Sequence, residues 1–343
     1  MKTQDLRIKS IKPLISPALL IEELPLPDAL GMQIRRDRQT VADIIHGRDK
    51  RLLVIVGPCS IHDPKAALEY ADRLALLAQK LKDKLFIVMR VYFEKPRTTV
   101  GWKGLINDPN LDDSCNINQG LRIARRLLLE IAEKGLPIAV EFLDTISPQY
   151  VADLVSWGAI GARTTESQVH RELASGLSMP IGFKNATSGD IDIALDAVKA
   201  ANHPHSFLGV TSQGLSAIVM TAGNPDAHVV LRGGKAGPNY DLASVQAITQ
   251  AQTARQVKTG IIIDASHANS QKDYRRQLDV MQSVQQTRQD HPELPIAGVM
   301  IESHLNAGRQ DLKPGQPLAY GQSITDACLG WTETETILNS LGA

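Results

Sequence analysis

Short apolar segments alternate with longer amphipathic segments along most of the chain, from about residue 51 onward. Eight of the short segments carry apolar residues on both faces, which is typical of parallel strands buried on both sides. These segments are 52–56, 85–92, 138–142, 159–162, 180–183, 229–231, 261–263 and 296–301. This alternation predicts an α/β fold, a (β/α)8 TIM barrel, for which about 250 residues are typical. A doubly wound open sheet is the alternative, although no GxGxxG or P-loop pattern follows any strand.

The amphipathic segments contain signals for the starts and ends of helices. Asp63-Pro64 predicts an N-cap followed by proline in the first turn of a helix. Ser147-Pro148 predicts the start of another helix, which we expect Gly158 to end. We expect Gly135 and Gly176 to end two further helices.

The first 49 residues do not follow this alternation. They contain a proline-rich stretch at 13–27 and a polar helical stretch at 35–48, without a strand pattern or candidate chemistry. We therefore expect an N-terminal extension at 1–49 that docks on another surface, and a catalytic barrel at 50–343.

One further segment, at about 205–222, does not fit a simple barrel. It contains two strand-like stretches, 207–210 and 217–220, on either side of a Ser-Gln-Gly turn. This pattern predicts a β-hairpin inserted before the sixth barrel strand.

The composition argues against several classes of protein. Lys plus Arg equals Asp plus Glu at 37 each, so the formal net charge of zero argues against a nucleic-acid or membrane-surface partner. Cys59, Cys115 and Cys328 are too few and too far apart for a disulfide framework, and they fit a reducing compartment. The chain shows neither an apolar signal region nor the run of about 20 apolar residues that spans a bilayer. We therefore expect a cytoplasmic protein.

Charged or metal-binding side chains stand at the end of every predicted strand. Functional residues of TIM barrels gather at the carboxyl ends of the strands, so these side chains should meet at one mouth. Four of them are cations: Arg90, Arg163, Lys184 and Arg232. Like charges held close together repel, so we expect bound anions such as phosphate and carboxylate groups, which Arg and Lys suit. A salt bridge at the barrel rim would explain any one cation but explains the set poorly.

The loop after the second strand adds further cations and hydroxyl groups. Its sequence, Lys95-Pro96-Arg97-Thr98-Thr99, predicts a second anion site, and an ordinary solvated loop is the alternative. Residues 101–104, Gly-Trp-Lys-Gly, lengthen the loop, which favours a lid over the mouth.

A metal site is expected on one side of the same mouth. Cys59, His267 and Glu302 follow the first, seventh and eighth strands, which become neighbours when the barrel closes, and Asp326 follows later. These sulfur, nitrogen and oxygen ligands suit one divalent metal ion (Mn, Fe, Co or Zn) that can act as a Lewis acid. A lone cysteine at a strand end is more often packed in the core, so the prediction depends on the shared location.

All of these candidate residues except Glu302 lie in seven motifs: GPCSIH at 57–62, RVYFEKPRTT at 90–99, GARTTES at 161–167, GFKN at 182–185, LRGG at 231–234, SHAN at 266–269 and GQSITD at 321–326. They resemble the motifs of the type I 3-deoxy-D-arabino-heptulosonate 7-phosphate (DAHP) synthases, a feedback-regulated family. The resemblance extends from about residue 5 to the C-terminus. It implies the first step of the shikimate pathway, in which phosphoenolpyruvate and D-erythrose 4-phosphate condense to DAHP with release of phosphate.

The resemblance also implies a role for each site residue. The residues implied to bind phosphoenolpyruvate are Arg90, Lys95, Arg163, Lys184 and Arg232. Those implied to bind the phosphate of erythrose 4-phosphate are Arg97 and Thr98. The implied metal ligands are Cys59, His267, Glu302 and Asp326. In catalysis, Lys95 would steady or protonate the nascent alkoxide, and Glu141 would lie near the reacting water.

Feedback inhibition by an aromatic amino acid is a further implication, within a homo-oligomer that is a dimer or a tetramer. The implied effector residues are Asp5, from a partner subunit, and Pro148, Gln149, Ser178 and Gly209. Gly209 leaves space beside a phenolic oxygen, which favours tyrosine over phenylalanine as the effector.

Two other functions compete with this interpretation. One is a related enzyme that joins phosphoenolpyruvate to arabinose 5-phosphate on the same fold, but the loop at 95–98 and the long extension argue against it. The other is a non-catalytic, effector-binding paralogue. Loss of a ligand would mark such a paralogue, whereas this chain has all four metal-binding positions and every cation.

Overall fold

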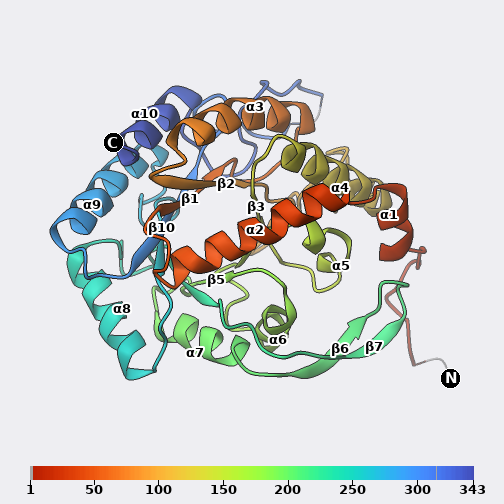
Figure 1. The fold of residues 1–343 in the computed structure, drawn as a ribbon. Helices are drawn as coiled ribbons and strands as arrows, with labels where there is room; N and C mark the ends of the chain where they lie inside the picture. The colour runs from red at the N-terminus through yellow and green to blue at the C-terminus, as the bar shows by residue number, and fades with distance from the viewer. Residues whose placement is uncertain (1–2, 314) are drawn as a thin grey trace.

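The computed structural model describes residues 3–313 and 315–343, and its main feature is a closed barrel of eight parallel strands (Figure 1). The strands are β1 (Leu52–Gly57), β2 (Leu85–Arg90), β3 (Ile138–Glu141), β4 (Trp157–Ile160), β5 (Ile181–Lys184), β8 (His228–Leu231), β9 (Ile261–Asp264) and β10 (Ile296–Glu302). They follow one another around the barrel, and β1 pairs with β10 to close it. Every one of these strands is buried along nearly its whole length. The predicted TIM barrel is confirmed.

Helices alternate with the strands and surround the barrel (Figure 1). They are α3 (Pro64–Leu81), α4 (Ile117–Glu133), α5 (Pro148–Val151) with η1 (Ala152–Leu154), α6 (Gln168–Gly176), α7 (Asp192–Ala201), α8 (Leu242–Ala254), η2 (Tyr274–Arg276) with α9 (Gln277–Asp290), and α10 (Trp331–Leu341). The Asp63 carboxylate accepts hydrogen bonds from the backbone N–H groups of Lys65 (2.9 Å) and Ala66 (3.3 Å), as its N-cap role requires. Gly135 follows α4 with a φ of +80°, and Gly176 is the last residue of α6, so both predicted helix ends are confirmed.

The prediction that Gly158 ends a helix is wrong, because this glycine lies inside β4. The helix that starts at Pro148 is only one turn long and continues briefly as η1. A Cβ atom at Gly158 would lie 2.5 Å from Ile181 and 2.8 Å from Phe142. Close packing between neighbouring strands therefore requires glycine here, and β4 begins two residues before the predicted strand.

The N-terminal segment forms two helices, α1 (Pro17–Glu23) and α2 (Asp28–Ile45), and its described residues form no strand. The first lies in the proline-rich stretch, where the Ser16 hydroxyl caps the helix and Pro17 occupies its first turn. The second crosses the N-terminal end of the barrel in Figure 1. Its Val41, Ile44 and Ile45 join the cluster of apolar side chains inside the barrel.

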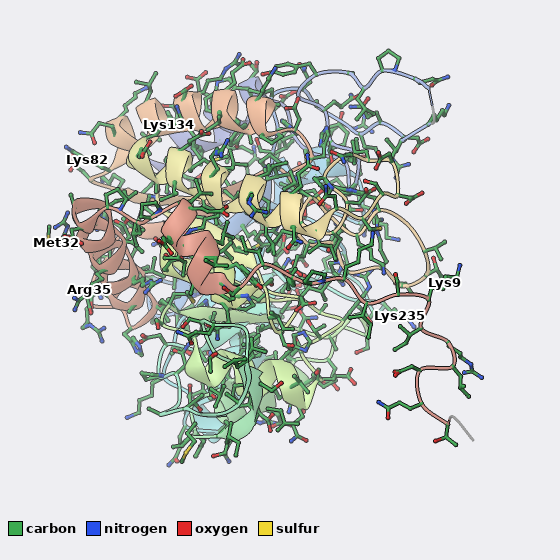
Figure 2. The ribbon with its side chains drawn as sticks, turned by 90° about the vertical axis from the view of Figure 1, so that its right-hand side faces the viewer. Lys9, Met32, Arg35, Lys82, Lys134 and Lys235 are labelled. Atoms are coloured by element: carbon green, nitrogen blue, oxygen red, sulfur yellow. The ribbon has the colours of Figure 1, made fainter. Side chains whose placement is uncertain are left out.

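The two ends of the barrel carry different parts of the chain. Figure 2 shows Met32 and Arg35 of α2 at one end and Lys235, which follows β8, at the other. Lys9 of the N-terminal segment lies at the same end as Lys235, so this segment runs along the side of the barrel. No helix among residues 3–313 and 315–343 is long and apolar enough to cross a membrane.

The predicted hairpin is confirmed as β6 (Ser206–Val210) and β7 (Ser216–Met220), which pair antiparallel outside the barrel. Its turn contacts the N-terminal segment, where the backbone N–H of Ala18 donates to the Ser212 carbonyl oxygen at 2.7 Å. One face of the hairpin is open, where the side chains of Leu208, Ile218 and Met220 are 75–89% exposed. Large apolar side chains left open in this way favour contact with a further surface.

Candidate active site

The carboxyl ends of the strands surround one cavity of about 520 Å³. Every residue that the sequence assigned to substrates, catalysis or metal lines it: Cys59, Arg90, Lys95, Arg97, Thr98, Glu141, Arg163, Lys184, Arg232, His267, Glu302 and Asp326. The structure therefore brings together residues that are up to 267 positions apart in the chain.

Three of the four predicted metal ligands form a compact cluster. The ligand atoms of Cys59, Glu302 and Asp326 all lie within 4.8 Å of one another, and Cys59 Sγ is 3.4 Å from Asp326 Oδ2. His267 lies beside this cluster, with Nε2 at 3.8 Å from Glu302 Oε1. One sulfur, one imidazole nitrogen and two carboxylates fit a borderline divalent metal ion, although this set does not select one metal.

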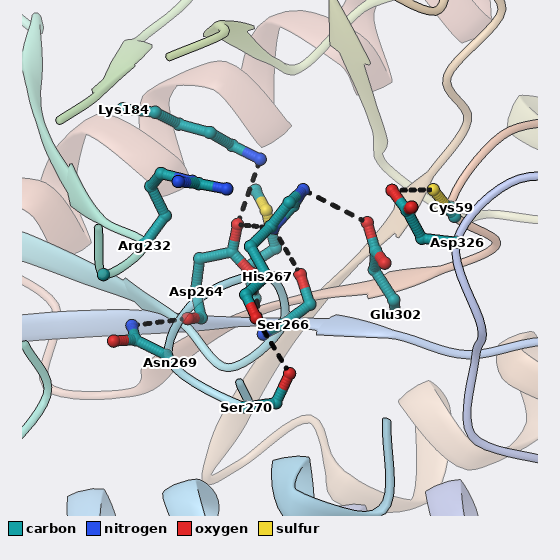
Figure 3. A network of polar contacts seen from close by, with 12 residues as sticks. Cys59, Lys184, Arg232, Asp264, Ser266, His267, Asn269, Ser270, Glu302 and Asp326 are labelled. Carbon is teal, nitrogen blue, oxygen red and sulfur yellow. Dashed lines mark hydrogen bonds and ion pairs between the residues drawn. The ribbon is translucent and has the colours of Figure 1, made fainter. Parts of the chain in front are cut away.

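A buried carboxylate orients His267, as the close-up in Figure 3 shows. Asp264 Oδ2 lies 3.0 Å from His267 Nδ1, and Asp264 Oδ1 accepts from the Ser266 hydroxyl (2.6 Å) and backbone N–H (3.0 Å). His267 has a φ of +60°, and this backbone turn directs its Nε2 toward Glu302. Such an outer partner fixes the orientation of a metal-binding imidazole and the position of its proton.

Two of the four predicted mouth cations have carboxylate partners in the protein. Lys184 Nζ lies 3.0 Å from Asp264 Oδ2, and an Arg90 nitrogen lies 3.0 Å from Glu302 Oε1. The Arg90 guanidinium also stacks 3.7 Å from the centre of the Tyr92 ring and donates to the backbone carbonyl groups of Pro58 and Cys59. These two cations are held rigidly before any ligand binds.

The other two cations form no ion pair with any residue in the described ranges. Arg163 donates to the Thr98 hydroxyl at 3.0 Å. Burial lowers the pKa of Arg232, and nearby Arg163 lowers it further, although Asp264 opposes both effects. Repulsion of this kind makes the position between Arg163 and Arg232 favourable for an anion.

Lys95 connects the loop after β2 to the metal-ligand cluster. Its ammonium lies 2.9 Å from Cys59 Sγ and 2.8 Å from Asp326 Oδ2. Burial alone would lower the pKa of Lys95, but the neighbouring Cys59, Asp326 and Glu302 raise it above its usual value. A lysine in this position can hold a proton next to an oxygen atom bound at the cluster.

The loop that carries Lys95, Arg97 and Thr98 is closed at its base. Glu94 and Gly104 form an antiparallel backbone bridge, and the Lys95 N–H donates to the Lys103 carbonyl oxygen at 2.9 Å. Within the same loop, Arg97 Nε–H donates to the Trp102 carbonyl oxygen at 2.8 Å. The terminal guanidinium nitrogens of Arg97 therefore remain available at the cavity wall.

Glu141, at the end of β3, faces Gly161 across the strands. The Glu141 side chain is 7% exposed, and its Oε1 occupies the space where any Cβ atom at position 161 would lie. Glycine at position 161 thus leaves room for the Glu141 carboxylate at the cavity.

Tyr92 and Glu94 are among the cavity-lining residues to which the sequence analysis gave no role. The Tyr92 hydroxyl is buried and has no hydrogen-bond partner in the described residues. Glu94 is 4% exposed and accepts three hydrogen bonds from the loop after β3. Its only sequence signal is a carboxylate beside the apolar Phe93, which does not reveal the contact.

A second, smaller cavity of about 120 Å³ lies between the hairpin and the helices α5 and α6. Its wall includes Pro148, Gln149 and Gly209 from the predicted effector residues, together with apolar side chains such as Leu173 and Phe207. Asp5 and Ser178 are not among its lining residues, although Ser178 directly follows the lining residue Leu177.

A barrel whose mouth combines two groups of cations with a thiol, imidazole and carboxylate cluster is typical of enzymes that act on phosphorylated small molecules. The sequence profile of the DAHP synthetase I family matches residues 31–339 of this chain. The chain belongs to the DAHP synthetase I family, and the DAHP synthase predicted from the motifs is confirmed.

Similar proteins come from bacteria and fungi. The "Phospho-2-dehydro-3-deoxyheptonate aldolase, Phe-sensitive" of Escherichia coli (strain K12) is 57% identical over 340 residues, covering 99% of this chain and 97% of the relative. The "tyrosine-inhibited" protein of the same name from Schizosaccharomyces pombe is 51% identical, covering 98% and 91%. The solved structure of the phospho-2-dehydro-3-deoxyheptonate aldolase from Francisella tularensis SCHU S4 is also similar, with 52% sequence identity and a TM-score of 0.95. The match covers 98% of this chain and 97% of that one.

Proposed function

We propose that this member of the DAHP synthetase I family condenses phosphoenolpyruvate with D-erythrose 4-phosphate, giving DAHP and phosphate. The observation that carries the proposal is one cavity that combines two groups of cations, at the strand ends and on the loop after β2, with a cluster of metal-ligand type. Two phosphorylated substrates need two such groups, and an aldehyde needs an electrophilic activator beside them.

The cations divide into two groups by their position. Around the barrel mouth, the residues proposed to bind the carboxylate and phosphate of phosphoenolpyruvate are Arg90, Lys95, Arg163, Lys184 and Arg232. On the loop after β2, Arg97 and Thr98 are proposed to bind the phosphate of erythrose 4-phosphate. The Arg163–Thr98 hydrogen bond links the two groups, so each substrate helps to order the site of the other.

Cys59, His267, Glu302 and Asp326 would hold one divalent ion, Mn, Fe, Co or Zn, which when bound polarises the aldehyde oxygen of erythrose 4-phosphate. The protein residues then organise the carbon–carbon bond. C3 of phosphoenolpyruvate attacks the aldehyde carbon, and Lys95 steadies or protonates the new alkoxide. Water held by Glu141 adds at C2, and the C–O bond to phosphate breaks.

A coupled assay of substrate consumption tests this proposal. Both substrates and a divalent metal ion are mixed with the protein, and loss of phosphoenolpyruvate absorbance is followed with and without a chelator. Consumption that needs both substrates and stops with the chelator supports the proposal. Replacing erythrose 4-phosphate with arabinose 5-phosphate identifies the competing synthase, and no consumption in either mixture supports the non-catalytic alternative.

Variants of the mouth separate the roles of its residues. Lys95→Met should reduce turnover strongly, and near-full turnover would show that Lys95 does not serve the alkoxide. Arg97→Ala should raise the KM for erythrose 4-phosphate more than the KM for phosphoenolpyruvate, because its guanidinium lies on the loop and not at the strand ends. Lys313→Ala is the control, because it also removes one cation but at a residue that does not line the cavity.

Regulation by an aromatic amino acid is the second part of the proposal. The apolar cavity at the hairpin would hold the ring, with Pro148, Gln149 and Gly209 in its wall. Ser178, beside that wall, and Asp5 of a partner subunit would complete the site. Gly209 favours tyrosine over phenylalanine, and calorimetric titration with both amino acids tests this, since tighter binding of phenylalanine would contradict it.

We propose a homo-oligomer, a dimer or a tetramer, in the cytoplasm. The exposed Leu208, Ile218 and Met220 of the hairpin support a subunit contact there, involving the N-terminal extension 1–49 of another copy. The free cysteines Cys59, Cys115 and Cys328 fit a reducing compartment. Light scattering of the wild type and of Ile218→Asp tests the contact, because the variant should have the lower mass.

A further inference from the structure

The cavity at the hairpin and the substrate loop are connected through one buried carboxylate, Glu94. This residue stands at the base of the loop that carries Lys95, Arg97 and Thr98, where it bridges to Gly104. Its side chain is 4% exposed and forms no ion pair with any described residue. A buried carboxylate without a cation depends entirely on the hydrogen-bond donors around it.

All its donors belong to the loop after β3. The Ser147 hydroxyl donates to Glu94 Oε2 at 2.8 Å, and the backbone N–H groups of Asp144 (3.1 Å) and Leu143 (3.4 Å) donate to the two carboxylate oxygens. Ser147 stands at the N-cap position of α5 but does not cap the helix with its side chain. Its hydroxyl instead contacts Glu94 and the Asp144 carbonyl oxygen.

The same loop forms part of the hairpin cavity. Thr145, Pro148 and Gln149 line that cavity and directly flank or follow the donors to Glu94. The loop also contacts α6, because the Leu143 carbonyl oxygen lies 2.7 Å from His170 Nε2. Other residues of α6, such as Val169 and Leu173, line the hairpin cavity. A ligand that moves this wall therefore moves the hydrogen-bond donors of Glu94.

The hydrogen bonds make the buried Glu94 carboxylate sensitive to the position of the loop after β3. The pKa of Glu94 is raised to about 7, mainly by burial and also by the nearby Asp144, while the hydrogen bond from Ser147 opposes the rise. If Ser147 shifts away, the carboxylate is left buried with fewer donors, and Glu94 must move with the loop or lose its charge. Either change alters the base of the loop that carries Arg97 and Thr98.

We propose that Glu94 is a positioning residue that couples occupancy of the hairpin cavity to the conformation of the substrate loop at 95–103. The inference rests on the proposed function, because it assigns the route by which an aromatic amino acid in that cavity inhibits the enzyme. Glu94 reaches the wall of the large cavity, but the role proposed for it is to position the loop that follows it.

The test uses Glu94→Gln and Ser147→Ala in the full-length protein, with Glu335→Gln on the exposed face of α10 as the matched control. Phenylalanine, tyrosine and tryptophan are each titrated into the protein by calorimetry. Each titration is done once without substrates and once with phosphoenolpyruvate together with an erythrose 4-phosphate analogue that lacks the aldehyde. The ratio of the two dissociation constants measures the coupling, and it does not need turnover. Inhibition of turnover by the same amino acids is measured in parallel.

We expect both variants to bind the amino acid with its wild-type dissociation constant in the absence of substrates. The coupling ratio and the inhibition should weaken by about fivefold or more, a change within the range of typical allosteric couplings. Glu94→Gln should also raise the KM for erythrose 4-phosphate more than it lowers kcat, whereas Ser147→Ala should keep wild-type kcat. Glu335→Gln should behave as the wild type.

Wild-type inhibition and coupling in both variants would overturn the inference, and so would a wild type that turns over but responds to none of the three amino acids. Failure of the wild type to consume phosphoenolpyruvate would count against the proposed function, while the coupling ratio would still report on Glu94. If Glu94→Gln fails to fold, Ser147→Ala alone decides, because it removes the donor and leaves the buried carboxylate in place.

Discussion

The ammonium of Lys184 lies 3.0 Å from the carboxylate of Asp264, and these two side chains are 3% and 0% exposed. The same carboxylate contacts His267, so one buried group links a proposed substrate cation to a proposed metal ligand (Figure 3). Lys184 and His267 together lower the pKa of Asp264 well below its usual value, against the effect of burial. Asp264 is therefore an ionised centre that orients both halves of the site.

Asp264→Asn should weaken both halves together. Asparagine keeps the size of the side chain but cannot balance Lys184, and breaking a buried ion pair costs about 3–5 kcal/mol. We expect metal affinity to fall by about tenfold to a hundredfold, as for other outer partners of metal-binding histidines, and the KM for phosphoenolpyruvate to rise. Calorimetry and initial rates measure the two effects, and Asp273→Asn, at an exposed ion pair with Arg275, is the control.

Gly161→Ala should impair catalysis with little loss of stability. The new Cβ atom would overlap Glu141 Oε1, which is the end of a side chain and can move aside. A displaced carboxylate would no longer hold the water in the position proposed for Glu141, so kcat should fall by about tenfold to a hundredfold. Gly31→Ala on α2, where the new atom meets Leu26 at an ordinary 3.6 Å, should leave kcat unchanged. Wild-type kcat in Gly161→Ala would argue against a role for Glu141.

The barrel was predictable because each buried strand is short, apolar on both faces and bounded by polar segments. The mouth was predictable for a related reason, since parallel strands of a closed barrel bring their carboxyl ends together. The residue type at each end, such as Arg90 or Lys184, then indicated the chemistry. These features depend on local sequence and on one rule of topology.

Features set by packing between distant segments were not predictable in this way. The sequence around Gly158 predicts the end of a helix. The residue instead lies inside a strand, where close contact with Phe142 and Ile181 leaves no room for a side chain. The extension offered no chemistry, yet Val41 and Ile45 join the apolar cluster inside the barrel. Glu94 and Ser147 are 53 positions apart, and nothing in either segment alone reveals their hydrogen bond.

Binding of a divalent metal ion should stabilise the folded protein through Cys59. A ligand that binds only the folded state adds about 2.7 kcal/mol at a concentration one hundred times its Kd. Thermal unfolding of the chelator-treated protein should therefore shift to higher temperature when Mn, Fe, Co or Zn is added. Cys59→Ala should lose this shift, whereas Cys115→Ala, at an exposed free cysteine, should keep it. An equal shift in both variants would place the metal elsewhere.

Acidification should destabilise the barrel through His228, which is fully buried on β8. Trp157 Nε1 lies 3.1 Å from His228 Nε2, and the Asp226 carbonyl oxygen lies 2.9 Å from Nδ1, so the ring is held neutral with its proton on Nδ1. Burial lowers the pKa of His228 to about 4 in the folded protein. The unfolded chain binds this proton at about pH 6.5, so it takes up the proton first as the pH falls.

The sign and size of the effect follow from these two values. Above about pH 6.5 the group is neutral in both states, and stability is lost as the pH falls from there to about 4, by up to about 3 kcal/mol. His228→Gln retains an acceptor for Trp157 and removes the titration, so its unfolding free energy should fall less over this range. His203→Gln, at an exposed histidine, should lose as much as the wild type. Denaturant unfolding at several pH values measures the difference, and parallel curves for all three proteins would show that His228 does not control acid stability.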